Sequence, residues 1–339
     1  MVRANKCRSL RVERAAMKLS APFRISGYVF AAMPSIVVHV DDGGQTGRGE
    51  AAGVYYLGDD QDRMAAMVES VREPMEGGIG RGGLNALLPP CGARNALDCA
   101  LWEVESLSSG VPVWALANVP EPRALISTFT LPADDPAILA GKVGSLDFAK
   151  AIKLKLDGDI DADAERIAVV RSARPDAWLG VDANQGYAAA DFDRLEDILV
   201  EHSVSLLEQP LPRGQEHLLA GWRPPFPVAA DESILDLAEL SERADHFDVI
   251  NIKLDKCGGL TEGLAMARAA RAMGKKVMVG NMGGSTLAMA PAFVLAQLCD
   301  LVDLDGPAAL ANDPQAEMIY SDGQIFVPEA LWGGQAPDA

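Results

Sequence analysis

The chain has 339 residues, of which 49% are hydrophobic and 23% are charged, as in a globular protein with a full core. This length suffices for one large domain with a smaller companion, or for two domains. The net charge of -18 argues against nucleic acid or an anionic membrane surface as a partner, since both are themselves negatively charged.

The cysteines and the N-terminal segment indicate a compartment. The five cysteines are scattered and form no CxxC pair, which is typical of free thiols in a reducing environment. Residues 1–20 carry too many charges for a signal peptide, and no run of the chain approaches the ~18 apolar residues of a membrane span. We therefore expect a cytoplasmic protein with no membrane partner.

The first part of the chain has a pattern of strands followed by helices. Alternating polar and apolar residues predict antiparallel strands over 10–20 and 28–40. Helical periodicity predicts helices over 60–75 and 93–108, on either side of the glycine-rich segment 77–92. Strands followed by helices predict a small α+β unit.

From about residue 123 onward, short apolar runs alternate with stretches rich in alanine, leucine and charged residues. This alternation predicts βαβ units around a buried parallel sheet. Eight such runs are what a (β/α)-barrel requires. An open doubly wound sheet is the alternative, but no G-x-G-x-x-G follows the first run to favour it. The runs span residues 124–130, 149–156, 177–184, 204–210, 226–233, 248–254, 275–281 and 301–307.

Polar residues stand at the ends of seven of these runs, where a buried strand should avoid them. In a parallel barrel the functional groups gather at the carboxyl ends of the strands. The residues are spaced 22 to 28 positions apart, about one βα unit each: Lys155, Asp182, Glu208, Asp231, Lys253, Asn281 and Asp303.

Asp182, Glu208 and Asp231 end three consecutive runs and predict a metal site. Three converging carboxylates repel one another, and a divalent cation removes that repulsion. Oxygen ligands without histidine or cysteine indicate one Mg²⁺ per subunit, with Mn²⁺ as an alternative. A single acid at such a position is more simply explained as a helix cap.

Two lysines, Lys155 and Lys253, are the candidate catalytic residues. Lys153 and Lys155 lie two apart and therefore point to the same face of their strand. Burial and a neighbouring like charge both lower the pKa of a lysine, so that it can act as a general base. Lys253 is expected across the barrel from Lys155. The alternative, that the lysines only pair with the metal acids, fits Lys153 best.

These groups together predict a proton transfer at the carbon next to a carboxylate. The metal can hold the substrate carboxylate and stabilise the enediolate that forms when the α-proton leaves. A lysine on each face of that carbon allows one to remove the proton and the other to return one. The result is racemisation or epimerisation, or elimination if a β-leaving group is present.

The same residues, in this order, resemble the enolase superfamily and within it the muconate lactonizing enzyme-like subgroup. The similar segments are KLKL at 153–156, VDANQGY at 181–187, LEQP at 207–210, ADES at 230–233, NIKLDKCGG at 251–259 and the helical segment 93–113. The resemblance implies a (β/α)7β modified TIM barrel with an N-terminal α+β capping domain. It places the capping domain at 1–118, the barrel at 119–308, and a C-terminal segment that returns to the cap at 309–339. It also implies Mg²⁺ held by the three acids and acid/base roles for the two catalytic lysines.

Within this subgroup, Asp303-Leu304-Asp305 resembles the pair that binds the free α-ammonium of a dipeptide in the dipeptide epimerases. Carboxylates only accept hydrogen bonds and an ammonium group only donates them, so the chemistry suits that role. The alternative is that one aspartate caps the following segment. Lys153 and Thr128 are further candidates for substrate binding, and so is Ser285, which lies where the chain departs from the family pattern.

The capping domain is expected to select the side chain of the substrate, through loops near 21–28 and 50–58. Arg24 in the first loop is a candidate partner for an acidic side chain, which predicts an L-Ala-D/L-Glu epimerase acting on a murein peptide. An exposed loop arginine without that role is the alternative. One departure from the family pattern follows run seven, where Gly283 and Gly284 stand before Ser285 and Thr286.

Two rival functions are also consistent with these residues. The first is another isomerase or lyase of the subgroup: an N-acylamino acid racemase, an o-succinylbenzoate synthase or a cycloisomerase, none of which would give the Asp303/Asp305 pair a cation. The second is a non-catalytic metal-binding barrel. Mandelate racemase-like chemistry would need a histidine after run seven, and none is there. The expected partner is a small dipeptide substrate, and the sequence does not determine whether the chain forms a homo-oligomer.

Overall fold

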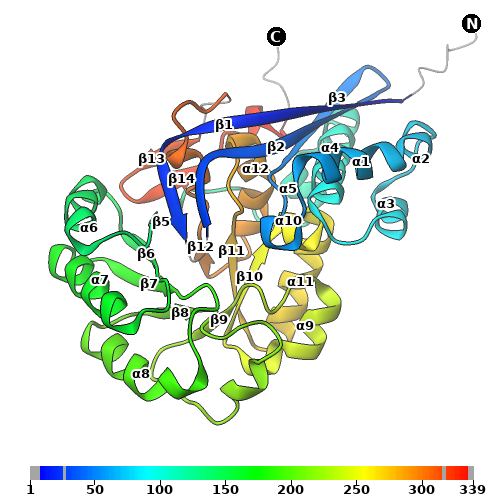
Figure 1. Ribbon diagram of the computed structural model, residues 1–339. Helices are drawn as coiled ribbons and strands as arrows, with labels where there is room; N and C mark the ends of the chain where they lie inside the picture. The colour runs from blue at the N-terminus through cyan, green and yellow to red at the C-terminus, as the bar shows by residue number, and fades with distance from the viewer. Residues whose placement is uncertain (1–7, 26–27, 315–317, 335–339) are drawn as a thin grey trace, which may run out of the picture.

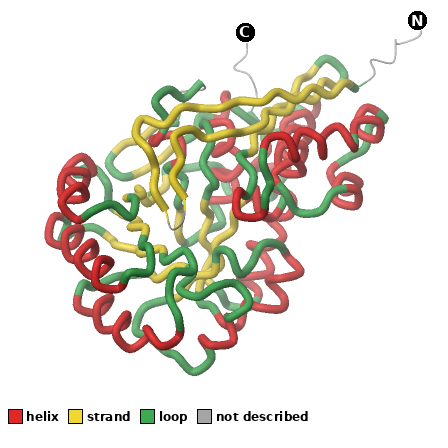
Figure 2. Tube along the Cα trace, in the orientation of Figure 1, coloured by secondary structure: helices red, strands yellow, loops and turns green. Residues whose placement is uncertain are grey.

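A computed structural model describes residues 8–25, 28–314 and 318–334 of the chain (Figure 1). Its elements form an N-terminal α+β unit that lies against one end of a barrel of eight parallel strands (Figures 1 and 2). Within these ranges no helix is long and apolar enough to cross a membrane.

The N-terminal unit is built on a three-stranded antiparallel sheet in the order β1-β2-β3. The sheet packs on α4 because β2 presents a row of alternating buried residues, Ile36, Val38 and Val40, to that helix. Gly47 and Gly49 of β3 permit the close approach: a Cβ at Gly49 would lie 2.0 Å from the Ala96 carbonyl oxygen of α4. The elements are β1 (Ser9–Ile25), β2 (Tyr28–Asp42), β3 (Gln45–Ala51), α1 (Gln61–Ser70), α2 (Arg72–Glu76), α3 (Arg81–Leu87), α4 (Gly92–Ser109) and α5 (Val113–Leu116).

The two predicted strands and both predicted helical regions of this unit are confirmed. The glycine-rich segment between the helical regions contains a further helix, α3, which the sequence pattern did not indicate. Its Leu84 is fully buried in the core of the unit, so tertiary packing outweighs the poor helix propensity of Gly82 and Gly83.

The barrel strands follow one another in chain order around an eight-stranded parallel sheet, which confirms the predicted (β/α)-barrel. Each predicted apolar run overlaps one barrel strand. The strands are β5 (Thr128–Leu131), β6 (Ala151–Lys155), β7 (Trp178–Asp182), β8 (Leu206–Glu208), β9 (Val228–Ala230), β10 (Val249–Lys253), β11 (Lys276–Gly280) and β12 (Leu301–Val302).

Helices on the outside connect most of these strands, with one exception. The β8–β9 connection has only a short 3-10 helix, Glu216–Leu219, because prolines at positions 210, 212, 224 and 225 interrupt helical backbone there. The barrel helices are α6 (Pro136–Val143), α7 (Ile160–Ala173), α8 (Phe192–Glu201), α9 (Leu237–Arg243), α10 (Leu254–Cys257), α11 (Leu260–Ala272) and α12 (Thr286–Ala296).

Most buried apolar residues of the barrel fall in two large hydrophobic clusters, and a small third cluster contains Leu206, Ala229, Val249 and Met278. Apolar residues of β5 to β8, among them Ile152 and Leu154 of β6, pack with α6, α7 and α8. Those of β10 to β12, among them Ile250 and Ile252 of β10, pack with α11, α12 and the C-terminal segment. The strands that carry the two candidate catalytic lysines therefore belong to different parts of the core.

The C-terminal segment contacts both the barrel and the N-terminal unit. Its hairpin, β13 (Ile319–Ser321) and β14 (Gln324–Phe326), pairs with β4 (Leu125–Ile126) beside the barrel. Further on, the Gly333 carbonyl accepts a hydrogen bond from the Val113 N–H at 2.7 Å, and the Trp332 indole donates to the Arg48 carbonyl at 3.0 Å. The segment thus ties the two parts of the molecule together, although the exact domain limits stay a prediction.

Candidate active site

A cavity lies between the N-terminal unit and the carboxyl ends of the barrel strands. The hairpin β1–β2 and the segment after β3 supply an apolar and aromatic wall, and the barrel supplies charged groups. In the stretch after β3, Tyr55 lies edge-on to Tyr28 and Phe30 of the hairpin. The described lining includes Leu19, Phe23, Phe30, Met33, Tyr55 and Tyr56 from the N-terminal unit, and Lys153, Lys155, Asp231, Glu232, Lys253, Asp303 and Asp305 from the barrel.

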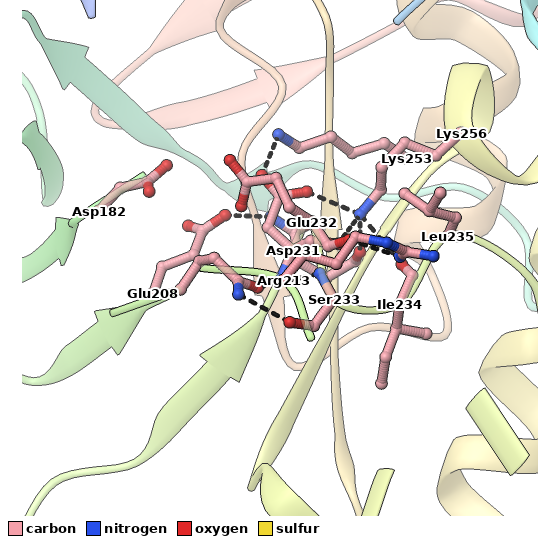
Figure 3. Close-up of polar contacts among 12 residues, drawn as sticks. Asp182, Glu208, Arg213, Asp231, Glu232, Ser233, Ile234, Leu235, Lys253 and Lys256 are labelled. Atoms are coloured by element: carbon pink, nitrogen blue, oxygen red, sulfur yellow. Dashed lines mark hydrogen bonds and ion pairs between the residues drawn. The ribbon is translucent and has the colours of Figure 1, made fainter. Parts of the chain in front are cut away.

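The three predicted metal ligands come together (Figure 3), and one of them, Asp231, lines the cavity. β7 ends at Asp182, β8 ends at Glu208, and Asp231 directly follows β9. One carboxylate oxygen from each lies within 4.8 Å of the others, and all three residues are buried. The structure therefore places the acids as the sequence predicts.

The donor set fits a divalent cation. Glu208 Oε2 is buried without a hydrogen-bond partner, which is rare for a carboxylate oxygen in a folded protein. Burial and the neighbouring charge of Asp182 raise the pKa of Glu208 to about 7. A cation among the three acids would give the unpaired oxygen a partner and remove the repulsion. Carboxylate oxygens are the ligands that Mg²⁺ prefers.

The two candidate catalytic lysines lie on opposite sides of the acid cluster. Lys155 ends β6 and Lys253 ends β10, and these strands are four positions apart among the eight. Lys155 Nζ donates to Asp182 Oδ2 at 2.5 Å, and Lys253 Nζ donates to Asp231 Oδ2 at 2.6 Å. Both lysines line the cavity, so each can reach a group held there.

The expected lowering of the lysine pKa values is wrong for two of the three lysines. Burial does disfavour the charged form of Lys253, but the carboxylates of Asp231 and Glu208 outweigh it and raise the pKa well above its ordinary value. The same balance raises the pKa of Lys153, where Asp303 is the nearest carboxylate. The alternative expectation, that the lysines pair with nearby acids, describes these two pKa shifts better than burial and a neighbouring lysine do.

Asp303 and Asp305 follow β12 and both line the cavity. Asp303 is already held on two sides, by the Thr128 hydroxyl at 2.6 Å and by an ion pair with Lys153. Asp305 accepts a hydrogen bond from the Thr130 N–H at 2.6 Å. Burial raises the pKa of Asp305, with a further contribution from Asp303. Thr128 and Lys153 thus contact Asp303, and of these two only Lys153 is among the described lining of the cavity.

Two other predicted substrate residues lie elsewhere. Arg24 is exposed on β1 and is absent from the described lining of the cavity, whereas its neighbour Phe23 is part of it. Residues 26 and 27 of the same predicted loop lie outside the described residues. The Ser285 side chain is fully buried and caps α12.

A substrate contact for Ser285 is therefore not supported. Its hydroxyl and its N–H both donate to Glu50 of β3, so these groups have a partner within the protein. The preceding loop residues Asn281, Met282 and Gly283 line the cavity in its place.

Several polar residues near the cluster were not singled out from the sequence. Glu232 is buried beside Asp231, and burial together with that neighbour raises its pKa to about 8. Asn184 donates its amide to Glu232 at 3.3 Å, and Asn251 donates to Glu208 at 2.7 Å. Lys256 pairs with Asp231 at 2.6 Å. Each lies within three positions of a strand-end residue in the family-like segments, and that proximity is the signal in the sequence.

A capped parallel barrel with acids and lysines at the carboxyl ends of its strands is the architecture of a barrel enzyme. Residues 140–331 match the family model described as Enolase C-terminal domain-like, and the chain belongs to the enolase superfamily.

Two curated relatives illustrate the activities found among similar proteins. The chain is 34% identical to the L-Ala-D/L-Glu epimerase of Escherichia coli, over 94% of this chain and 100% of the relative. It is 38% identical to an N-acetyl-D-glutamate racemase of a Pseudoalteromonas species, over 73% of this chain and 78% of the relative. Epimerases and racemases are isomerases, and this protein is an enzyme of that class.

Two solved structures are similar over almost the whole chain. An enolase family member from Agrobacterium tumefaciens, described with bound sodium and L-Ala-L-Glu, aligns with a TM-score of 0.91 at 33% identity, covering 96% of this chain and 100% of that one. A dipeptide epimerase from Methylococcus capsulatus, complexed with Mg and the dipeptide L-Arg-D-Lys, aligns with a TM-score of 0.86 at 26% identity, covering 96% and 98%.

Proposed function

We propose that this protein is a Mg²⁺-dependent dipeptide epimerase that inverts the α-carbon of the C-terminal residue. The observation that carries the proposal is the placement of Lys155 and Lys253 on opposite strands, beside the acid cluster and in the same cavity as Asp303 and Asp305. A two-base inversion needs one acid/base group on each face of the carbon.

The proton transfers fall to the two lysines. With the substrate carboxylate at the acid cluster, Lys155 would face one side of the α-carbon and Lys253 the other. One amine takes the proton, which leaves an enediolate, and the opposite ammonium returns a proton to the other face. A divalent cation held by Asp182, Glu208 and Asp231 would stabilise the negative charge that develops on the carboxylate.

The second pair of carboxylates favours a substrate with a free amino group. Asp303 and Asp305 both reach the cavity, and within the described part of the chain one lysine, Lys153, forms an ion pair with this pair of acids, at Asp303. An α-ammonium would therefore add a cation where negative charge remains in excess. An N-acyl amino acid, the substrate type of the racemase alternative, has an uncharged nitrogen and would leave that excess uncompensated.

L-Ala-L-Glu is the first dipeptide to test, because the E. coli relative is named for L-Ala-D/L-Glu. A glutamate side chain needs a cationic partner, and Arg24 is the candidate because it adjoins the cavity residue Phe23 on β1. Its side chain would have to turn from solvent toward the cavity in the complex.

The test is incubation with L,L-dipeptides in D₂O with Mg²⁺, followed by NMR. The expected result is deuterium at the α-carbon of the C-terminal residue and growth of a new diastereomer. N-acetyl-glutamate serves as the matched substrate without an α-ammonium. Turnover of that compound with no exchange into any dipeptide would refute the epimerase and favour the racemase.

A further inference from the structure

In each of the three acids of the cluster, one carboxylate oxygen accepts a hydrogen bond from a residue other than the two catalytic lysine candidates. The Asn184 N–H donates to Asp182 Oδ1 at 3.0 Å, and the Asn251 amide donates to Glu208 Oε1 at 2.7 Å. The Lys256 ammonium donates to Asp231 Oδ1 at 2.6 Å (Figure 3).

The second oxygen of each acid faces the site. Asp182 Oδ2 and Asp231 Oδ2 accept from the two catalytic lysine candidates, and Glu208 Oε2 has no hydrogen-bond partner. Two of these inner oxygens also lie near one ammonium group, since Lys153 Nζ is 3.9 Å from Asp182 Oδ2 and 3.6 Å from Glu208 Oε2. The outer donors, which are Asn184, Asn251 and Lys256, thus leave the second carboxylate oxygen of each acid facing the site.

Lys256 is the charged member of the three outer donors, and its surroundings differ from those of the other lysines. It lies on α10, one turn after β10, and is only 2% exposed. Besides the Asp231 carboxylate, its ammonium donates to the Asp231 carbonyl, to the Asn251 carbonyl at 3.1 Å and to the Ile234 carbonyl at 3.2 Å. It is absent from the described cavity lining, so its position is not one that touches substrate.

These contacts restrict the rotation of the Asp231 side chain. One ammonium group bonds both the carboxylate and the backbone carbonyl of the same residue, which ties the end of the side chain to its own main chain. The other two carbonyls fix that ammonium to β10 and to the segment after β9. Asp231 Oδ1 is thereby held away from the cavity, and Oδ2 is left toward it.

We propose that Lys256 is a positioning residue of the metal centre, which holds Asp231 so that Oδ2 is its ligand oxygen. The proposal rests on the metal site of the proposed function and adds a residue that acts through a ligand. Groups that orient a ligand in this way change metal affinity by about 10- to 100-fold when they are removed.

Charge alone predicts the opposite effect. Removing a cation close to a divalent metal site lowers the repulsion and would tighten metal binding. Two substitutions separate these effects. Lys256→Met removes both the charge and the donors, whereas Lys256→Gln removes the charge and keeps two N–H donors on a side chain that is one bond shorter.

The experiment is calorimetric titration of the full-length protein with Mg²⁺ and Mn²⁺, with circular dichroism and thermal unfolding to check folding. Lys142→Met is the matched control, since Lys142 pairs with Asp134 on the outside of the barrel. We expect one metal per wild-type chain, binding at least about 10-fold weaker in Lys256→Met, a smaller loss in Lys256→Gln, and no change in the control. If Lys256→Met does not fold, weaker binding by the folded Lys256→Gln carries the same conclusion.

Unchanged or tighter binding by the folded Lys256 variants would overturn the proposal, as would a wild-type chain that binds no divalent metal. The epimerase assignment fails separately. A wild-type protein that binds metal, loses affinity on Lys256 substitution and epimerises no dipeptide would refute the reaction and support the positioning role.

Discussion

Replacing each catalytic lysine candidate by methionine should stop epimerisation without dismantling the acid cluster. In Lys253→Met, Asp231 keeps its ion pair with Lys256. In Lys155→Met, Asp182 keeps the hydrogen bond from the Asn184 N–H. Methionine is close to lysine in length and shape, so each substitution removes an ammonium group and leaves little empty volume in the barrel.

The magnitude follows from the number of lysines that each process uses. Epimerisation needs both lysines, and loss of one acid/base group lowers a rate by about 10²- to 10⁴-fold. Exchange of the α-proton with solvent needs only the lysine on the face that carries the proton. Each variant should therefore retain exchange with one diastereomer, and the two variants should retain it with opposite ones.

The assay is NMR in D₂O with each pure diastereomer as the starting compound, with wild type and Lys142→Met as controls. Exchange by both variants with the same diastereomer would refute the opposite placement of the two bases. Epimerisation by either variant at the wild-type rate would show that the substituted lysine is not an acid/base group.

Three further changes and one treatment test other parts of the structure. Asp303→Asn should raise KM for a dipeptide about 10- to 100-fold, because a hydrogen bond between charged groups contributes roughly 1.5–3 kcal/mol, and steady-state kinetics checks this. Asp255→Asn should flatten the dependence of the unfolding free energy on pH, as measured by urea titrations. Burial raises the pKa of Asp255 to about 7 in the folded state, so the wild-type unfolding free energy falls as pH rises from about 4 to 7. Gly49→Ala should cost at least about 1–3 kcal/mol of unfolding free energy, because its Cβ meets the Ala96 carbonyl at 2.0 Å. Removal of metal by EDTA should lower Tm in calorimetry, since a cation at 100 times its Kd stabilises the folded state by about 2.7 kcal/mol.

Each of these has a result that contradicts it. Equal KM values in wild type and Asp303→Asn would refute the proposed ammonium site. An unchanged pH profile of the unfolding free energy in Asp255→Asn would mean that another group titrates between about pH 4 and 7. Gly141→Ala, where a Cβ meets nothing within 4 Å, is the control for Gly49→Ala and should be neutral or slightly stabilising. A Tm that EDTA leaves unchanged would argue against a bound divalent cation.

The barrel and its acid cluster could be predicted because their pattern is local. A parallel strand is buried on both faces, so a charge at its end stands out in the sequence, and the topology brings such ends together. Asp182, Glu208 and Asp231 needed no knowledge of distant contacts to be found.

What could not be predicted depends on groups far apart in the chain. The partner of Ser285 is Glu50, 235 positions away, and nothing near either residue indicates the pair. Burial lowers the pKa of Lys153, and Asp303, 150 positions away, is the first of the carboxylates that outweigh burial and raise it. The helix α3 forms because the core buries Leu84, against the local preference of its glycines.

The division of most of the barrel core between two large clusters has a stereochemical consequence. The strand of Lys155 is packed in one cluster and the strand of Lys253 in the other. A packing defect in one cluster, for example at Ile152, would displace Lys155, the base proposed for one face of the substrate. Exchange with one diastereomer would then slow more than with the other. Net inversion would fall equally in both directions, because the equilibrium between the diastereomers belongs to the substrate and not to the protein.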